Sequence, residues 1–313
     1  MVTRDNQQWK ALIIIGVLPV FLSAQQNDTP KPAVQNPSPM VEKTRAHERV
    51  SQQKYAGLEF KIVDVLPKAI EIFIPQKRRD SKNFDLLLHF HGAGFVVQHA
   101  AMKHRDALVV ATINLGGGSS VYGNAFEDST KFSALIAAIN DSLEQKLARP
   151  LTLRKLILSG FSAGYGAIRK TISTPQNFNR VDAILLLDGI HASYVPERLV
   201  LAEGGQIDSS GVAAFIRFAN EAAKKNSAKK FLITHSEIFP GTFVSTTEAT
   251  DFILQNLGMK RQPVLKWGPL GMQQLSQARQ HHFAVLGFAG NTAPDHVDHL
   301  HALDYFLKSL EKL

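Results

Sequence analysis

A serine between two glycines is the first group in this chain that suits covalent chemistry. Gly160-Phe161-Ser162-Ala163-Gly164 fits the pattern G-x-S-x-G between a predicted buried strand, 153–159, and a predicted helix from Tyr165. A tight strand-to-helix turn leaves no room for side chains at its flanks, and it lifts the Ser162 hydroxyl above the sheet. The backbone N–H of Ala163, at the helix start, then faces a developing oxyanion. We therefore predict that Ser162 is a nucleophile.

A glycine loop follows an earlier predicted strand, 84–90, with the sequence His89-Phe90-His91-Gly92-Ala93-Gly94. A tight loop at this point presents a second backbone N–H, and we predict that of Ala93 as the other oxyanion donor. His89 and His91 have the alternation of an H-x-H metal pair on one strand face. No third ligand is evident, so we predict no metal and favour packing roles for both histidines.

Three histidines lie close together within 291–301, near the end of the chain, and are candidates for the proton acceptor that a nucleophilic serine needs. His296 follows Pro294, which marks the loop before a predicted helix at 297–313. We predict that His296 is the general base, and His299, one turn later, is the alternative. Asp295, Asp298 and the two histidines also form a set that could converge on a metal, which the serine motif makes the less favoured interpretation.

Two carboxylates compete to orient that histidine. Asp188 ends the predicted strand 181–187, and Glu237 follows the predicted strand 229–234. Sequential elements are usually adjacent, so the strand before Asp188 should neighbour the strand before Ser162. We therefore predict Asp188 as the acid, with Glu237 as the alternative.

Two further segments are predicted to surround a ligand. Gly116-Gly117-Gly118 follows the predicted strand 107–115, and loops at the carboxyl ends of parallel strands line the ligand crevice. Tyr122, a few residues later, is a predicted substrate contact. The stretch 193–211 is the predicted lid.

The elements that must position these groups alternate between strand and helix from Phe84 to the end of the chain. Continuous apolar runs such as FDLLLHF (84–90) are typical of strands buried on both faces. Helical periodicity is clear at 130–147. The pattern predicts an α/β fold with a mostly parallel twisted sheet of about eight strands and helices on both faces. Two opening strands, 58–65 and 69–75, are close enough to form an antiparallel edge.

With these motifs in place, the chain resembles the α/β-hydrolase superfamily in its serine esterase or lipase-like branch. The resemblance rests on the HGAG loop at 91–94, the GFSAG turn at 160–164, a later acid and a histidine before the last helix. It implies the order Ser, acid, His and a Ser162–His296–Asp188 triad. The oxyanion loop departs from HGGG at Ala93, which a backbone donor tolerates. In this superfamily the acid more usually follows the strand before Glu237.

The first 45 residues differ in composition from the rest. Residues 1–24 combine Arg4 and Lys10 with an apolar run of about a dozen residues and Ser23-Ala24, as in a secretory signal. The run is short for a bilayer span, and an uncleaved anchor is the alternative. Residues 25–45 form a predicted Pro-rich flexible linker, and 46–313 the catalytic domain. We expect cleavage after Ala24, no stable membrane span after processing, and a secreted or periplasmic protein.

Composition excludes other classes. The 313 residues contain no cysteine, which rules out disulfides and cysteine nucleophiles, and the charge of +8 comes without a dense basic run. Nucleic-acid binding is therefore not expected, nor is a cofactor. The resemblance implies hydrolysis of a small-molecule or glycan-linked carboxylic ester through an acyl-enzyme. A peptidase or amidase, or a catalytically silent binding protein of the same fold, are the alternatives.

Overall fold

The computed structural model describes residues 46–106 and 108–313, apart from the side chain of Arg78. The predicted signal at 1–24 and linker at 25–45 lie outside these residues and stay predictions. None of the described helices is long and apolar enough to cross a membrane.

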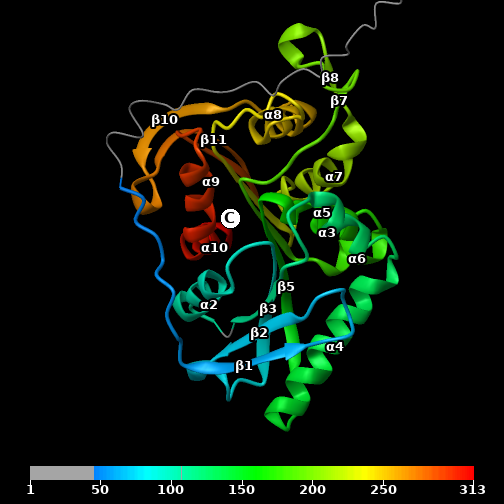
Figure 1. Ribbon diagram of the computed structural model, residues 1–313, viewed down its shortest axis with the longest axis vertical. Coiled ribbons are helices and arrows are strands. Elements are labelled where there is room, and N and C mark those ends of the chain that lie inside the picture. The colour runs from blue at the N-terminus through cyan, green and yellow to red at the C-terminus, as the bar shows by residue number, and fades with distance from the viewer. Residues whose placement is uncertain (1–45, 107) are drawn as a thin grey trace, which may run out of the picture. The chain divides into compact units, whose positions relative to one another are not determined.

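A ten-stranded sheet runs through the described residues, in the order β1-β2-β4-β3-β5-β6-β9-β12-β11-β10 (Figure 1). Its strands are β1 Gly57–Ile62, β2 Ile70–Pro75, β3 Asn83–Phe90, β4 Leu108–Ile113, β5 Thr152–Phe161, β6 Ala183–Leu187, β9 Lys230–His235, β10 Gln262–Trp267, β11 Gln273–Gln280 and β12 Phe283–Phe288. A separate small ribbon pairs β7 Tyr194–Val195 with β8 Gln206–Ile207.

The six central strands, from β4 to β12, are parallel. The hairpin β1–β2 forms an antiparallel edge, as predicted. At the other edge β11 and β10 add an antiparallel hairpin, so the sheet has ten strands where about eight are predicted. The segment 262–280 gives no strand signal because it is polar and β10 is largely exposed.

Helices cover both faces of the sheet, as predicted. They are α2 Gly94–Lys103, α3 Ser119–Ala125, α4 Thr130–Leu147, α5 Tyr165–Thr171, α6 Pro175–Arg180, α7 Ala213–Ala222, α8 Thr246–Asn256, α9 Ala293–His301 and α10 Leu303–Glu311. Helices α2, α9 and α10 pack into one apolar cluster, and α3, α4, α5, α7 and α8 into the other.

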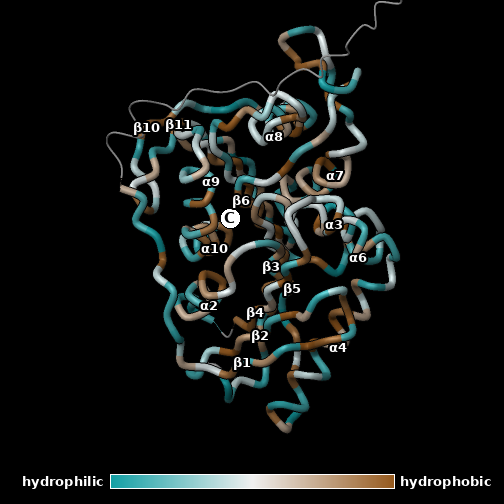
Figure 2. The backbone as a smooth tube through the Cα atoms, in the orientation of Figure 1, coloured by the Kyte–Doolittle hydropathy of each residue, from teal (hydrophilic) through white to brown (hydrophobic). Residues whose placement is uncertain are grey.

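Alternate residues of the central strands enter the two clusters. On β3, Leu86 and Leu88 face one cluster and Leu87 the other. Most positions are therefore apolar, because both faces are buried. Figure 2 shows these hydrophobic residues along the central strands.

The C-terminal helix begins earlier than predicted and is divided at Ala302 into α9 and α10. Thr292 caps α9: its hydroxyl accepts the N–H of Asp295, whose carboxylate accepts the N–H of Thr292. This capping box starts the helix at Ala293, so His296 lies in the first turn of a helix and not in the loop before it.

Candidate functional site

Ser162 occupies a strained turn between β5 and α5. Its φ of 47° lies in the left-handed region, which residues with side chains rarely adopt. A Cβ on Gly164 would lie 2.0 Å from the carbonyl oxygen of Phe90, and one on Gly160 would lie 3.0 Å from the Gly164 carbonyl carbon. Glycines are thus required on both sides of the serine, and the predicted strand–turn–helix at 160–164 is confirmed.

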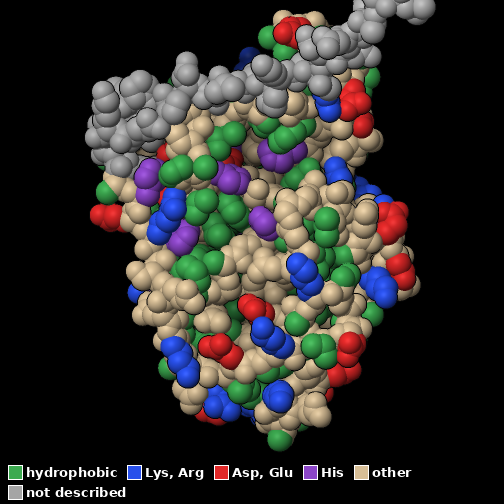
Figure 3. All heavy atoms as spheres, viewed as in Figure 1, with side chains coloured by type: hydrophobic (Ala, Val, Ile, Leu, Met, Phe, Trp, Pro, Cys, Tyr) green, Lys and Arg blue, Asp and Glu red, His purple; other side chains and the backbone are tan. Residues whose placement is uncertain are grey.

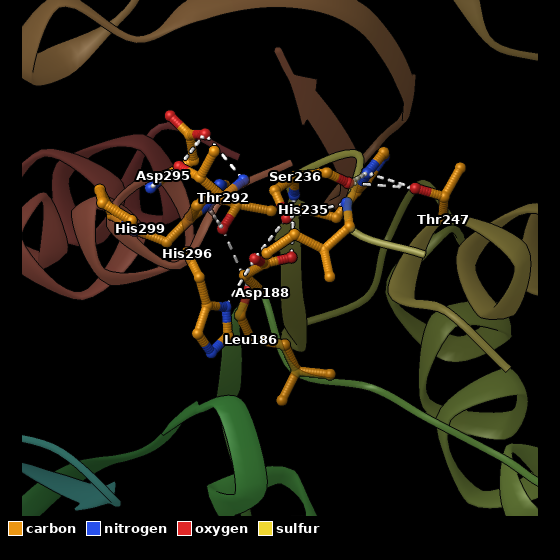
Figure 4. Close-up of polar contacts among 12 residues, drawn as sticks. Leu186, Asp188, His235, Ser236, Thr247, Thr292, Asp295, His296 and His299 are labelled. Carbon is orange, nitrogen blue, oxygen red and sulfur yellow. Dashed lines mark hydrogen bonds and ion pairs between the residues drawn. The ribbon is translucent and has the colours of Figure 1, made fainter. Parts of the chain in front are cut away.

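The structure brings His296 and Asp188 together from positions 108 residues apart. Nδ1 of His296, on α9, lies 2.7 Å from Oδ2 of Asp188, which follows β6 (Figure 4). A carboxylate at this position holds the imidazole with its proton on Nδ1 and leaves Nε2 free to accept another. The pair has the chemistry of a general base and its orienting acid.

Asp188 is almost completely buried and receives two hydrogen bonds from Ser236. The Ser236 N–H donates to Oδ1 at 2.8 Å, and the hydroxyl donates to Oδ2 at 2.6 Å. Burial by itself raises the pKa of Asp188, but the charges of His299 and His296 and these hydrogen bonds outweigh it. The net effect lowers the pKa, so Asp188 is ionised at neutral pH.

The alternative acid and base make other contacts. Glu237 is exposed, and its Oε2 accepts the N–H of Gly290 at 3.1 Å. His299 is buried, and its Nδ1 lies 2.8 Å from the hydroxyl oxygen of Thr234. The geometry therefore favours Asp188 and His296 over both alternatives.

Phe161, the residue before the serine, separates two imidazoles. The His296 ring lies 4.5 Å from its centroid, and the His91 ring stacks on it at 5.9 Å. Burial first, and the charge of His296 second, lower the pKa of His91, so this imidazole is neutral at pH 7. The neutral His91 ring adds no charge beside His296.

Tyr122 holds His91 in place. Its hydroxyl lies 2.9 Å from His91 Nδ1 and accepts the N–H of Leu115 at 3.2 Å. The side chain is fully buried, at 0% exposure, and burial raises its pKa. The prediction that Tyr122 touches substrate is therefore corrected: it supports the loop that follows β3.

The two predicted oxyanion donors lie at the ends of neighbouring strands, because Phe90 of β3 pairs with Gly160 of β5. Ala93 is the N-cap of α2, and its N–H donates to none of the described residues. Ala163 lies in the first turn after β5, where N–H groups have no partner within the helix. Their role as an oxyanion hole stays a prediction.

Side chains fix the loop that carries Ala93. Asn114 exchanges two hydrogen bonds of 2.9 Å with the backbone N–H and C=O of Gly92. His89 is buried between Ser159 Oγ, at 3.0 Å, and the carbonyl oxygen of His91, at 3.0 Å. The packing role predicted for His89 is confirmed.

A cavity of about 800 Å³ opens beside the serine. Ser162 and Ala163 form part of its wall, with the glycine loop at 117–118 and residues between 191 and 211 around them. These are the two segments predicted to surround a ligand. Figure 3 shows histidine side chains gathered around a hollow on this face.

The metal interpretation of the last histidines is not supported, because His296 bonds Asp188 and His299 bonds Thr234. Within the described residues, the one group of suitable ligands is His47, Asp295 and Asp298, which shares its two carboxylates with that set and contains neither His296 nor His299. Arg49 already donates to Asp298 at 2.9 Å, and a fixed guanidinium disfavours a cation there.

Sequence reasoning missed Ser236 and the contacts of Phe161. Ser236 directly follows β9, the strand end to which the resemblance assigns the acid more usually. Its position at this strand end is the sequence feature that could have identified it. No pattern marks Phe161, because its neighbours come from distant parts of the chain.

No family model matches the chain. No curated protein matches its sequence. The structure is similar to an acylaminoacyl peptidase from Pyrococcus horikoshii, with 12% identity and a TM-score of 0.44 over 83% of this chain and 42% of that one. The chain thus spans less than half the length of that peptidase.

Two smaller proteins show the same level of similarity. An S-formylglutathione hydrolase from Agrobacterium tumefaciens has 12% identity and a TM-score of 0.45, with 83% of this chain and 97% of that one covered. A cold-adapted esterase from an Arctic intertidal metagenomic library has 13% identity and a TM-score of 0.42, with 83% and 96% covered.

The fold assignment rests on the strand order and the serine turn. A mostly parallel sheet covered on both faces, with Ser162 at a strained strand-to-helix turn on its carboxyl edge, is the α/β-hydrolase fold that the sequence predicts.

Proposed function

We propose that the protein is a serine hydrolase that cleaves carboxylic esters through an acyl-enzyme. One observation carries the proposal: a buried, ionised carboxylate holds an imidazole 2.7 Å away on the same sheet edge as a strained serine turn. This set of groups serves nucleophilic acyl transfer, and the cavity beside Ser162 gives an ester room to bind.

The chemistry follows from the position of each group. Ser162 Oγ attacks the ester carbonyl, and His296 Nε2 accepts its proton. The protonated imidazole then donates to the departing alcohol, which leaves an acyl group on Ser162. Water attacks the acyl-enzyme in the second half, again with His296 as the base, and the acid is released.

Two parts of the site lower the barrier. Asp188 stabilises the imidazolium by charge and keeps the Nδ1–H tautomer, while the N–H groups of Ala93 and Ala163 bind the oxyanion. No hydrogen bond joins Ser162 Oγ to the His296 ring among the described residues. Such contacts often tighten only when substrate is bound.

The test is Ser162→Ala with Ser309→Ala as the matched control. Ser309 lies on α10 and donates to the carbonyl of Tyr305, far from the serine turn in sequence. We expect Ser162→Ala to lower turnover of aryl esters by about 10⁶-fold, the scale of nucleophile loss in a serine enzyme. Circular dichroism should show both variants folded.

A fluorophosphonate probe completes the test, because it labels only an activated serine. Labelling of the wild type and of Ser309→Ala, but not of Ser162→Ala, is the expected result. If the probe labels Ser162 but no ester is hydrolysed, amides would replace esters as the proposed substrates. Absence of labelling in the folded wild type would overturn it and leave a silent binding protein.

A further inference from the structure

Arg169 brings a positive charge to the wall of the cavity that holds Ser162. It lies on α5, the helix that begins directly after the serine turn, and it is half-buried. Its guanidinium lies over the ring of Tyr165, 5.6 Å from the centroid, and Tyr165 lines the same cavity. The side chain therefore has a fixed place beside the reaction centre.

The guanidinium has unused hydrogen-bonding capacity. Its one hydrogen bond to a described residue is a long one, 3.4 Å from Nη1 to the carbonyl oxygen of Gly211, out of five N–H donors. It forms no ion pair with a described carboxylate. Lys170, the next residue, is paired with Glu127 at 2.6 Å. Asp208 lines the same cavity, and its Oδ1 accepts the N–H of Ser210, but its carboxylate forms no ion pair with Arg169.

A second cavity extends the positive region. It measures about 520 Å³, shares Arg169 and Ser210 with the first cavity, and is also lined by Lys170 and Arg217. Among the described residues, no acidic side chain lines this second cavity. Arg217 itself is committed to the backbone carbonyls of Ile172 and Ser173. Arg169 thus stands at the junction of the two cavities as the cation that is available to a ligand.

The larger cavity also has aromatic walls. The His191 ring lies 4.8 Å from that of Phe243 and 5.5 Å from that of Tyr165. His191 donates through Nδ1 to the carbonyl of Val244 at 3.0 Å, and burial lowers its pKa, so it is neutral at pH 7. An apolar part of a ligand therefore finds uncharged rings, and an anionic part finds Arg169.

We infer that the substrate is an ester with a carboxylate away from the scissile bond, and that Arg169 is the residue that selects it. The planar fork of a guanidinium matches a carboxylate in a bidentate pair. This inference rests on the proposed esterase function. It makes Arg169 a specificity-determining residue and gives it no part in the chemical steps.

The experiment uses two matched pairs of substrates. The acyl-side pair is the 4-nitrophenyl monoester of adipic acid and the same ester with its free carboxylate replaced by a carboxamide. The alcohol-side pair is 4-carboxyphenyl butyrate and 4-carbamoylphenyl butyrate. We expect the wild type to favour the carboxylate in at least one pair by about 10-fold or more in kcat/KM, the scale of a charged hydrogen bond.

Three variants assign that preference. Arg169→Gln should abolish it, mainly through a higher KM for the carboxylate substrate, with the rate on the neutral amide within about 3-fold of wild type. Arg169→Lys should keep part of it, since the charge remains but the fork is lost. Lys170→Gln removes the same charge from a neighbouring residue outside the larger cavity, and it should keep the full preference.

The outcomes separate the inference from the proposed function. Turnover of the neutral esters that depends on Ser162, without a carboxylate preference, would overturn the inference alone. The inference would also be overturned if Lys170→Gln abolished the carboxylate preference as fully as Arg169→Gln. The positive electrostatic potential of the whole region, and not a contact with Arg169, would then cause the preference. Failure of every ester, with no labelling of Ser162, would overturn both. If Arg169→Gln does not fold, the Arg169→Lys result and the wild-type preference decide.

Discussion

The carboxylate that holds His296 comes from the end of β6 and not from the end of β9. At the end of β9 stands Ser236, which donates its N–H and its hydroxyl to Asp188. The acid therefore gains hydrogen bonds from the position where a triad acid more usually lies. A buried carboxylate with these bonds stays ionised and rigid, which is what an orienting acid needs.

Neutralising this carboxylate should stop catalysis. We expect Asp188→Asn to lower turnover by up to about 10⁴-fold, because the amide favours the wrong tautomer of His296. Glu237→Gln should keep nearly full activity, since the Glu237 carboxylate accepts only the N–H of Gly290 among the described groups. Steady-state kinetics on one aryl ester, with circular dichroism for both variants, makes the comparison.

The reverse result would assign the acid to Glu237. Asp188 would then be a structural carboxylate that orders the ends of β6 and β9. Equal activity in both variants would mean that His296 needs no orienting acid.

Residues inside motifs could be predicted from the sequence, and residues outside motifs could not. Ser162 and Ala163 follow from the chain around them, and Asp188 and His296 follow from strand ends and order. Ser236 and Phe161 contact residues from other elements, which no local pattern reports. Tyr122 lies just after the predicted glycine loop, on α3, but its hydroxyl contacts His91, which follows the distant strand β3.

At the scale of elements, the loop after β6 approaches the serine turn so closely that Gly189 has no space for a side chain. A Cβ there would lie 2.3 Å from the carbonyl oxygen of Ser162 and 2.6 Å from its nitrogen. The two backbone segments that carry Ser162 and Asp188 are therefore in direct contact. The two segments can come this close because Gly189 has no side chain between them.

Gly189→Ala should consequently displace the serine turn. We expect a loss of about 2 kcal/mol or more in the free energy of unfolding, as for overpacking of a buried site, and an activity loss of at least 100-fold. Gly117→Ala is the control for stability, since a Cβ there meets nothing within 4 Å. Urea unfolding and ester kinetics measure both effects.

Two findings would contradict this view of the loop. One is wild-type stability and activity in Gly189→Ala, which would mean that the loop can retreat at no cost. The other is an equal loss of stability in Gly117→Ala, which would make the effect a general one of replacing glycine.

Elements with strong apolar signals could be predicted, and weakly patterned ones could not. The central strands are buried on both faces, so their sequences are continuously hydrophobic and easily recognised. Strands β10 and β11 form an exposed polar hairpin whose pairing depends on the neighbouring β12. The sequence predicts that the last helix begins at 297, whereas α9 begins at Ala293, because the capping box of Thr292 and Asp295 sets its start.

At the scale of the whole molecule, the parallel sheet places buried histidines close to the proposed catalytic groups. His89 lies near the end of β3 and His235 at the end of β9, and both are fully or almost fully buried. Burial lowers the pKa of His89 to about 3. Burial, and then the charge of Arg261, lower the pKa of His235 to about 3. The folded protein therefore holds both rings neutral well below pH 6.

This burial predicts that the fold loses stability in mild acid. The unfolded chain protonates these histidines near their ordinary pKa of 6.5, whereas the folded protein resists protonation down to about pH 3. The unfolded state thus binds more protons between these values, so stability falls as pH falls through the window. At pH 5 each histidine should cost about 2 kcal/mol relative to pH 7, at 1.36 kcal/mol per unit.

Urea unfolding followed by circular dichroism at pH 7, 6 and 5 measures this loss. Asp188 does not contribute in this range, because its pKa is lowered from an ordinary value that already lies near 3.8. His235→Asn removes one of these buried histidines and should reduce the difference between pH 7 and pH 5 by about 2 kcal/mol, whatever its effect at pH 7. His91 and His191, whose pKa values are also lowered, add to the difference that remains. His281→Gln changes an exposed histidine and should leave the difference unchanged. Equal free energies of unfolding at pH 7 and pH 5 in the wild type would show that the two rings do not stay neutral in the folded protein.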